Sequence, residues 1–298
     1  MTFVSVIVPV FNDAERLGRC LTALEAQTYP SDSYEVVVLD NGSQPPLTDL
    51  LGVFAHVRLV GEPRPGVSRA RVTGIEHARG EVLAFTDSDC LPEPGWLANG
   101  VACLQQTTNR GVVGGRIEMF DDGSGPSSIA TTLSVATHLK QDRFLKGHWA
   151  VCANLFTSRR IVAAVGGMNP ALISSGEVEW CQRVHAAGYE LAYAVESVVR
   201  HPARSSIRAL CQRAVRHEYA WAQLRETATL GRGFRFWVGQ HLVWPLRDIH
   251  RDLLRSSRLT LVEKIQTSAL AVLLMHVRMI AWFALRLGIP YEVRANWG

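Results

Sequence analysis

The stretch VSVIVPVFNDAERLGRCLTALEAQ (residues 4–27) places a run of β-branched residues directly before a segment with helical periodicity. The apolar run at 4–10 is continuous rather than alternating, as expected of a strand buried on both faces of a sheet. Asn12 or Asp13 can cap the helix that follows. Three leucines then recur at helical spacing: Leu17, Leu21 and Leu24. The stretch therefore predicts one strand and one helix.

The same alternation continues along the first part of the chain. Further buried strands are predicted at 34–40, 57–61 and 81–87, and a helix at 67–80 that Gly80 closes. Strands and helices that alternate with short connections predict a parallel, doubly wound sheet, in which ligands bind beyond the carboxyl ends of the strands. Three polar sites follow strand ends and should meet in one crevice: Phe11-Asn12-Asp13, Asp40-Asn41-Gly42-Ser43 and Asp87-Ser88-Asp89.

The rest of the chain is less regular and then becomes helical. From about residue 205 the pattern is helical to the end. Between these parts we expect a strand at 111–120, a loop at 121–128, a strand that turns into a short helix within 148–160, and a helix ended by Gly188 followed by a strand within 177–194.

Composition is that of a globular chain. With 298 residues, 47% of them hydrophobic and 19% charged, the sequence can build one large α/β domain, or one domain with a helical appendage. Residues 1–199 carry 15 basic against 21 acidic residues, whereas residues 200–298 carry 16 against 6, so the two parts should meet different partners. Six scattered cysteines without CxxC spacing predict reduced thiols in a cytosolic protein, and the N-terminus is predicted to be a strand rather than a signal peptide.

The segment 259–288 is a long apolar helix with basic residues. Arg278 and Arg286 interrupt its apolar run, which favours a basic amphipathic helix on a membrane surface over a span. A helix packed on the domain or on a second subunit is the alternative, and amphipathic character alone does not separate the two. The residues expected on one face are Val262, Ile265, Ala269, Val272, His276, Ile280, Phe283 and Leu287.

Two carboxylates, Asp87 and Asp89, flank one small residue at a predicted strand end. They can form a solvated Asx turn. They can also bind Mg²⁺ or Mn²⁺, which proteins hold through one or two carboxylates together with substrate phosphates. In an extended stretch both side chains point the same way, so Asp89 could hold the metal while Asp87 takes a ribose hydroxyl or a metal-bound water.

Five other polar residues are candidates, each with a simpler alternative. Asp40 can accept from turn amides, or from a base N–H such as uracil N3–H. Arg71 can be a surface residue, or it can pair with a diphosphate or Asp87. Glu177 and Glu179 suit a first helical turn, and one of them could instead be a general base. His201 ends a predicted strand and is either structural or a third metal ligand.

Four motifs in order, VSVIVPVFND, VVVLDNGS, SRARVTGIEHARGEVLAFTDSDCLPEPGWL and SSGEVEWCQRVHAAGY…VVRHPAR, carry a family resemblance. Across residues 3–203 the sequence resembles the family 2 glycosyltransferases of GT-A fold. The resemblance implies a mixed, mostly parallel Rossmann-like sheet flanked by helices. It also implies an inverting reaction, in which an acceptor hydroxyl displaces the diphosphate of a metal-bound nucleotide-sugar in one step.

The resemblance also assigns roles to single residues. It implies that Asp40 takes the base N–H, that Asp87 and Asp89 form the D-x-D pair with Asp89 as the direct metal ligand, and that Glu177 is the base, with Glu179 as second choice. His201 matches a histidine that reaches the metal or diphosphate. The other implied nucleotide contacts are Pro9, Phe11, Asn12, Arg71 and Ser88.

The sequence departs from the family pattern at three positions. Glu177 stands where the family carries an aspartate, and Gly176 removes a second acid before it. In the segment RVTG (71–74), valine replaces the usual asparagine. The helical tail matches none of the motifs. These departures leave the choice between Glu177 and Glu179 to the structure.

The expected organisation is a catalytic domain at 1–204, with a nucleotide-binding half (1–110) and an acceptor and base half (111–204), and a helical region at 205–298. The expected partners are a nucleotide-sugar, with a UDP-sugar favoured, Mn²⁺ or Mg²⁺, and a sugar, lipid-linked or small-molecule acceptor, but no nucleic acid. The expected location is cytoplasmic, and the basic tail is compatible with contact to the inner face of the membrane or with a homodimer. A nucleotidyltransferase and a non-catalytic nucleotide-sugar-binding protein are the rival classes.

Overall fold

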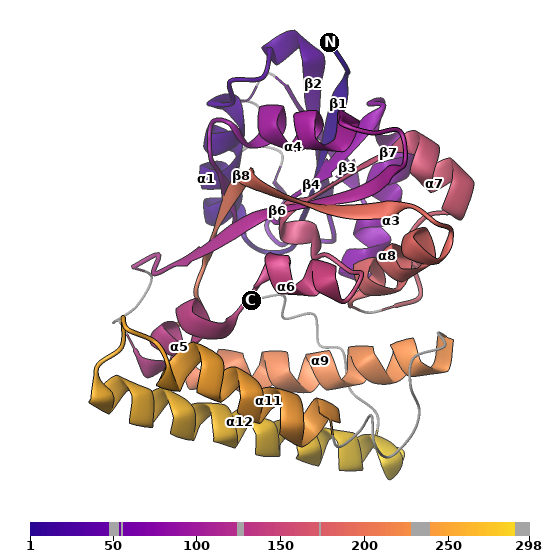
Figure 1. Cartoon of the computed structure of the whole chain (residues 1–298). Coiled ribbons are helices and arrows are strands. Elements are labelled where there is room, and N and C mark those ends of the chain that lie inside the picture. Colours follow the sequence, from indigo (N-terminus) through magenta and orange to yellow (C-terminus); the bar gives the residue numbers. More distant parts are fainter. Residues whose placement is uncertain (48–53, 55, 124–127, 173, 228–238, 290–298) are drawn as a thin grey trace. The chain divides into compact units, whose positions relative to one another are not determined.

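The computed structural model describes residues 1–47, 54, 56–123, 128–172, 174–227 and 239–289 (Figure 1). The chain divides into two compact units. The first comprises residues 1–118 and 140–201, and the second comprises residues 119–139 and 202–296. Parts of two predictions, the 121–128 loop and the helical tail, lie outside the described residues.

The described strands of the first unit form one mixed sheet in the order β3-β2-β1-β4-β7-β6-β8-β5. Neighbours among the first four strands pair in parallel, and the pairs β4–β7, β6–β7 and β5–β8 are antiparallel. The predicted mixed, mostly parallel α/β fold is confirmed. The strands are β1 (Val4–Val10), β2 (Tyr34–Asp40), β3 (Val57–Gly61), β4 (Val82–Phe85), β5 (Leu91–Pro92), β6 (Arg110–Phe120), β7 (Leu155–Ser158) and β8 (Glu190–Pro202).

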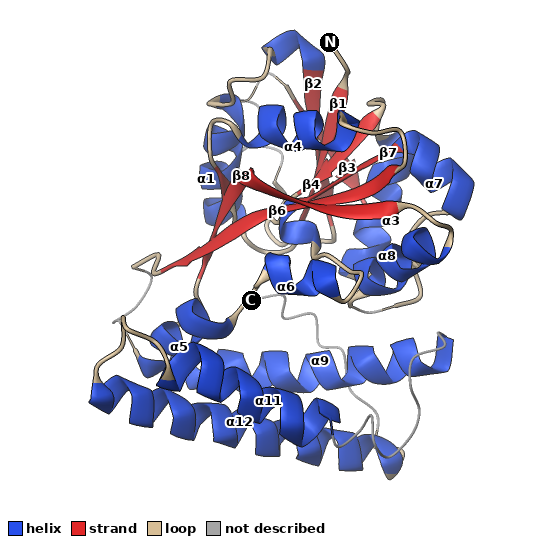
Figure 2. Cartoon of the chain, in the orientation of Figure 1, coloured by secondary structure: helices blue, strands red, loops and turns tan. Residues whose placement is uncertain are grey.

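Helices cover both faces of this sheet (Figure 2). Alternate residues of β1 enter two separate cores because successive side chains of a strand point to opposite faces. Val6 lies in a core with residues of α1 and α4, and Ile7 lies in a core with residues of α3, α7 and α8. The helices of this unit are α1 (Ala14–Glu25), α3 (Val67–His77), α4 (Trp96–Gln105), α6 (Gln141–Lys146), α7 (Arg159–Val165) and α8 (Gly176–Ala186).

Two predictions about helix ends are wrong. The helix predicted at 67–80 ends at His77, so Gly80 does not close it. A Cβ at Gly80 would collide with the backbone nitrogen of Ser5, so glycine is needed there for close approach to β1. At the start of α1, Asp13 makes no capping hydrogen bond from its side chain. It pairs instead with Arg16 at 3.6 Å.

The second unit is a helical assembly. Its common apolar core joins residues of α5, α9, η4 and α12. Capping boxes begin α5, through Ser128 with Thr131, and α12, through Thr260 with Glu263. The elements are α5 (Ile129–Thr137), α9 (Ile207–Thr227), the π-helix η3 (Gly239–Val243), α11 (Trp244–Asp248), the π-helix η4 (Ile249–Leu254) and α12 (Leu261–Arg286).

The long helix α12 has two different faces. The residues buried in this unit are Thr267, Leu270, Met275 and Ala281. The face predicted at 259–288 is exposed at every predicted position, with Ile265 at 62% and Ile280 at 68%. Among the described residues, α12 alone is long and apolar enough to cross a membrane by length and composition. An exposed apolar helix face of this size is typical of an interaction surface.

Candidate active site

The pair Asp87 and Asp89 lies on a turn after the end of β4. The prediction that they share an extended stretch is wrong, because β4 ends at Phe85 and the chain then turns, with the Cys90 N–H donating to the carbonyl of Asp87 (3.1 Å). The turn places the pair at the carboxyl end of β4, next to the end of β1 in the sheet. This is the edge at which parallel sheets bind ligands.

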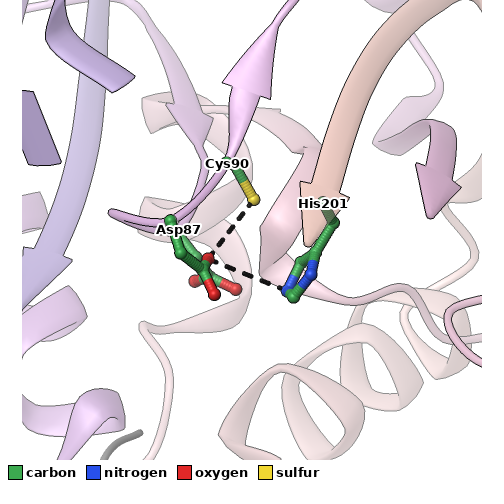
Figure 3. A group of neighbouring side chains, drawn as sticks. Asp87, Cys90 and His201 are labelled. Carbon is green, nitrogen blue, oxygen red and sulfur yellow. Dashed lines mark hydrogen bonds and ion pairs between the residues drawn. The ribbon is translucent and has the colours of Figure 1, made fainter. Parts of the chain in front are cut away.

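Pairing of β5 with β8 brings His201 to the same place. Leu91 pairs with Arg200, so His201 lies beside the turn. Its Nε2 is 3.8 Å from Asp89 Oδ1. Ligand atoms of Asp87, Asp89, Cys90 and His201 all lie within 4.8 Å of one another. Figure 3 shows the labelled Cys90 and His201 side chains pointing toward the aspartate carboxylates.

The donor set fits a divalent cation. Carboxylate oxygens are the ligands that Mg²⁺ and Mn²⁺ prefer, and an imidazole nitrogen suits a transition metal, so the set favours Mn²⁺. Cys90 was missed by sequence reasoning, although it directly follows the pair. Burial, and after it the charges of Asp89 and Asp87, raise the pKa of its thiol. The thiol donates to Asp89 Oδ1 at 3.8 Å, so Cys90 helps to orient that carboxylate.

Arg71 links the aspartate pair to α8. It lies on α3 and is 5% exposed. Its Nη2 donates to Asp87 Oδ1 at 2.8 Å, and its Nη1 donates to Glu177 Oε2 at 3.4 Å. The predicted pairing of Arg71 with Asp87 is therefore present, and the alternative of a surface arginine is wrong. The buried Arg71 guanidinium therefore binds one carboxylate from the turn after β4 and one from the start of α8.

Glu177 is the acidic residue of α8 that contacts Arg71. Burial, opposed by Arg71, raises its pKa above the ordinary value. A buried carboxylate with a raised pKa is a better proton acceptor than an exposed one. Glu179 instead pairs with Arg183 four residues on, at 2.5 Å and 3.1 Å. Of the two glutamates, Glu177 is the one in contact with the Arg71 and Asp87 pair.

The glycine before Glu177 has a steric reason. A Cβ at Gly176 would lie 2.7 Å from Ser68 Oγ and 3.1 Å from Ser68 Cβ, because the start of α8 packs against the start of α3. A second acid at this position has no room. Ser175 adopts a left-handed conformation (φ 62°) just before the helix and sets the direction in which α8 begins. The departure from the family pattern at Gly176 therefore follows from close packing.

The loops after β1 and β2 are joined by hydrogen bonds. Asn12 Oδ1 accepts from the Gln44 N–H at 2.7 Å, and the Asn12 N–H donates to Ser43 Oγ at 2.9 Å. Asn12 therefore ties the two loops together rather than capping α1. Asp40 Oδ1 accepts from the Ser43 N–H at 2.9 Å, as its turn alternative predicted. Its other carboxylate oxygen makes no hydrogen bond within the described residues.

Three other residues were predicted at the site, Pro9, Phe11 and Ser88, and a fourth, Asn41, was not. Pro9 was predicted in the first nucleotide-binding loop, but it lies within β1, buried and paired with Leu39. Phe11 is half-buried in the loop itself, and Ser88 lies between the two aspartates. Asn41 was missed: its side chain donates to two carbonyls and accepts from the Gly66 N–H, which fixes the loop before α3.

Comparisons with known proteins show which family the chain belongs to. Residues 5–164 match the model of glycosyl transferase family 2. Glycosyltransferase AglE of Haloferax volcanii is 38% identical over 209 residues, which cover 68% of each chain. The pre-mycofactocin glycosyltransferase of Mycobacterium tuberculosis is 28% identical over 69% of this chain, and the match spans only 44% of that protein.

A solved structure shares the fold. Mannosyltransferase PcManGT from Pyrobaculum calidifontis, in complex with GDP-Man and Mn²⁺, superimposes with a TM-score of 0.66 at 20% identity. The match covers 95% of this chain and 87% of that one. The family match and the AglE relative, together with this fold, establish that the chain belongs to glycosyl transferase family 2.

Proposed function

We propose that this chain moves a sugar from a nucleotide-diphosphate donor to an acceptor hydroxyl, with inversion at the anomeric carbon. The observation that carries the proposal is the single network formed by the Asp87 and Asp89 turn, Arg71 and Glu177. It supplies a cation site for the leaving diphosphate and a separate carboxylate for the attacking hydroxyl. A nucleotidyltransferase or a degenerate binding protein has no need for this second carboxylate.

The metal side of the site has three proposed ligands. Asp89 and His201 would hold Mn²⁺ or Mg²⁺ directly, and Asp87, which also pairs with Arg71, would contact the ion directly or through water. A bound divalent ion neutralises the diphosphate and makes it a better leaving group. Arg71 keeps Asp87 oriented through a charge-assisted hydrogen bond.

The base side rests on Glu177. Its ionised form takes the proton of the acceptor hydroxyl as the oxygen attacks the anomeric carbon, a contribution of about 10²–10⁴-fold to the rate. Arg71 donates to this carboxylate and opposes its protonation, so the base stays usable near neutral pH despite burial. Positioning of the two substrates and electrostatic stabilisation of the leaving group supply the rest of the rate.

The donor is proposed to be a UDP-sugar. The carboxylate oxygen of Asp40 that the turn leaves free can accept one base N–H, as uracil N3–H requires. Phe11 and Asn12 lie in the adjoining loop and are proposed to border the base. The solved relative binds GDP-Man, so guanine is the competing base. Direct comparison of UDP- and GDP-linked donors therefore decides this point.

The acceptor is proposed to be presented at the cytoplasmic surface of a membrane. Exposed apolar side chains of α12 and α11 include Ile280, Phe283 and Trp244. Arg247 of α11, and Arg255 and Arg258 just before α12, are also exposed. Exposed apolar and basic side chains together suit a membrane surface with anionic lipid headgroups. Because the opposite face of α12 packs within its own unit, the helix fits the interface better than a span. A second copy of the chain is the alternative occupant.

The test is turnover of a panel of UDP- and GDP-sugars with Mn²⁺, with Mg²⁺ and with a chelator. Slow donor hydrolysis needs no knowledge of the acceptor. The proposal expects metal-dependent release of nucleoside diphosphate from one donor class. No turnover and no nucleotide binding with either metal would refute it. Metal-dependent binding without turnover would favour the non-catalytic alternative. Co-sedimentation with anionic vesicles tests whether a membrane covers the exposed face of α12. Light scattering tests whether a second copy of the chain covers it instead.

A further inference from the structure

The cation site contains a sulfur atom that is not required as a ligand for the proposed transfer. Cys90 follows Asp89 in the chain and is fully buried, and its backbone N–H donates to the Asp87 carbonyl at 3.1 Å. Its Sγ lies 3.8 Å from Asp89 Oδ1, and His201 Nε2 lies 3.8 Å from the same oxygen. Figure 3 shows both side chains directed toward the aspartate carboxylates. Mg²⁺ and Mn²⁺ prefer oxygen ligands, so the thiol suits a different class of cation.

The spacing of the donor atoms matches a tetrahedral zinc site. The four donors are Asp87, Asp89, Cys90 and His201. Zinc binds sulfur at about 2.3 Å and nitrogen or oxygen at about 2.0–2.2 Å, which sets neighbouring donors about 3.4–3.6 Å apart. Both separations of 3.8 Å are close to that spacing. All four donor atoms lie within 4.8 Å of one another, so closure on zinc needs movements of roughly 1 Å. Asp87 can take part, because a carboxylate that accepts from Arg71 through Oδ1 has a second oxygen.

The backbone holds Cys90 in this position. Leu91, the next residue, pairs with Arg200 on β8, which fixes the turn beside the strand that carries the imidazole. The turn is also held by α1, where Cys20 Sγ donates to the Asp87 carbonyl at 3.7 Å. Cys20 itself is not one of the four donors. Since the Cys90 thiol is already placed beside the other donors, it loses little conformational freedom when it binds a metal.

We propose that Cys90 is a zinc ligand, and that Zn²⁺ held by the four donors blocks the site against Mn²⁺ and the donor. Thiolate and imidazole ligands suit zinc, and divalent zinc generally binds such sites more tightly than manganese does. On binding, the thiol releases its proton to solvent and a sulfur electron pair forms the bond to the ion. Four protein ligands fill a tetrahedral ion, which leaves no position for diphosphate oxygens. The zinc site follows from the donor geometry, whereas its effect on transfer rests on the proposed function.

The first experiment measures metal binding by the full chain without any donor. Co²⁺ is the probe, because a thiolate bound to Co²⁺ absorbs in the near ultraviolet. The unaltered chain should show this band, and Zn²⁺ should remove it by displacement. Cys90→Ser should lack the band and bind Zn²⁺ about 100-fold more weakly, since even groups that only orient a metal ligand contribute about 10-fold to 100-fold. Cys20→Ala, the matched control at the same turn, should bind both metals as the unaltered chain does.

Three results of this experiment would overturn the proposal. They are absence of the band from the unaltered chain, its survival in Cys90→Ser, and its survival in Asp89→Asn, which would place the ion elsewhere. If Cys90→Ser does not fold, Cys90→Ala takes its place. The unaltered chain and Asp89→Asn give a result in either case.

The second experiment measures inhibition of donor turnover by Zn²⁺, with the Mn²⁺-supported rate of each variant as its own reference. The unaltered chain should be inhibited by Zn²⁺ well below the Mn²⁺ concentration, and Cys90→Ser should need about 100-fold more Zn²⁺. Equal inhibition of the two would overturn the blocking role. A thiolate band in a chain that turns over no donor with Mn²⁺ would support the zinc site and count against the proposed function.

Discussion

Replacing Arg71 by glutamine should destabilise the fold and change the titration of Glu177. Arg71 is buried and donates to Asp87 at 2.8 Å and to Glu177 at 3.4 Å. At an effective dielectric constant of about 20, the Coulomb attraction across 3.4 Å is about 5 kcal/mol before desolvation is counted. Removing one partner of a buried pair costs about 3–5 kcal/mol, because the remaining charge is left uncompensated. We expect a loss of that size for Arg71→Gln at neutral pH.

The sign of the pH effect follows from the same contact. Arg71 lowers the pKa of Glu177 against the stronger effect of burial, so its removal raises that pKa further. A buried carboxyl with a raised pKa favours the folded state while protonated, and this contribution is lost as pH rises through the folded pKa. The destabilisation by Arg71→Gln should therefore be smaller at acid pH and grow toward neutral pH.

The assay is urea unfolding at several pH values, with Arg69→Gln on the same helix as the matched control. Arg71→Lys keeps a charge but loses the forked geometry, and it should fall between the unaltered chain and Arg71→Gln. If Arg71→Gln does not fold, the lysine variant still carries the test. Unfolding free energies equal to those of Arg69→Gln at every pH would refute the bridging role.

Three further predictions concern the same site. Gly176→Ala should lower thermal stability because its Cβ would meet Ser68 Oγ, and adding Ser68→Ala should restore much of the loss, which thermal unfolding of both variants checks. Asp89→Ala should abolish the donor turnover that Mn²⁺ supports, whereas Cys90→Ala should keep it, and titration of activity with Mn²⁺ checks both variants. The rate of transfer should fall at acid pH with an apparent pKa above the ordinary glutamate value of 4.5, because burial raises the pKa of Glu177. An apparent pKa at or below 4.5, read from the pH profile of the rate, would contradict its role as base.

The sequence predicts the fold well where local pattern decides it. The continuous apolar run at 4–10 predicted a strand buried on both faces, and β1 feeds two cores. The end of the helix at 67–80 was wrong because Gly80 is required by contact with β1, which sequence pattern does not report. Local composition predicts elements, whereas distant contacts decide how they end.

The candidate site could likewise be predicted from the sequence only in part. The polar residues at strand ends could be predicted to meet, because parallel strands present their carboxyl ends at one edge. The partnership of Arg71 with Glu177 joins residues 106 positions apart, and only the tertiary fold reveals it. The place of Cys90 beside His201 depends on the register of β5 with β8, which no short-range pattern encodes.

Glu177 is proposed to be the base of a metal-dependent sugar transfer. The most direct test is turnover and nucleotide-sugar affinity of Glu177→Gln, beside Glu179→Gln as the matched control on the same helix. If Glu177 is the base, Glu177→Gln loses turnover by about 10²–10⁴-fold while the Kd of the donor stays within a few-fold. Glu179→Gln, which loses its pair with Arg183, should keep turnover. Retained turnover in Glu177→Gln, with loss in Glu179→Gln, would show that Glu177 is not the base.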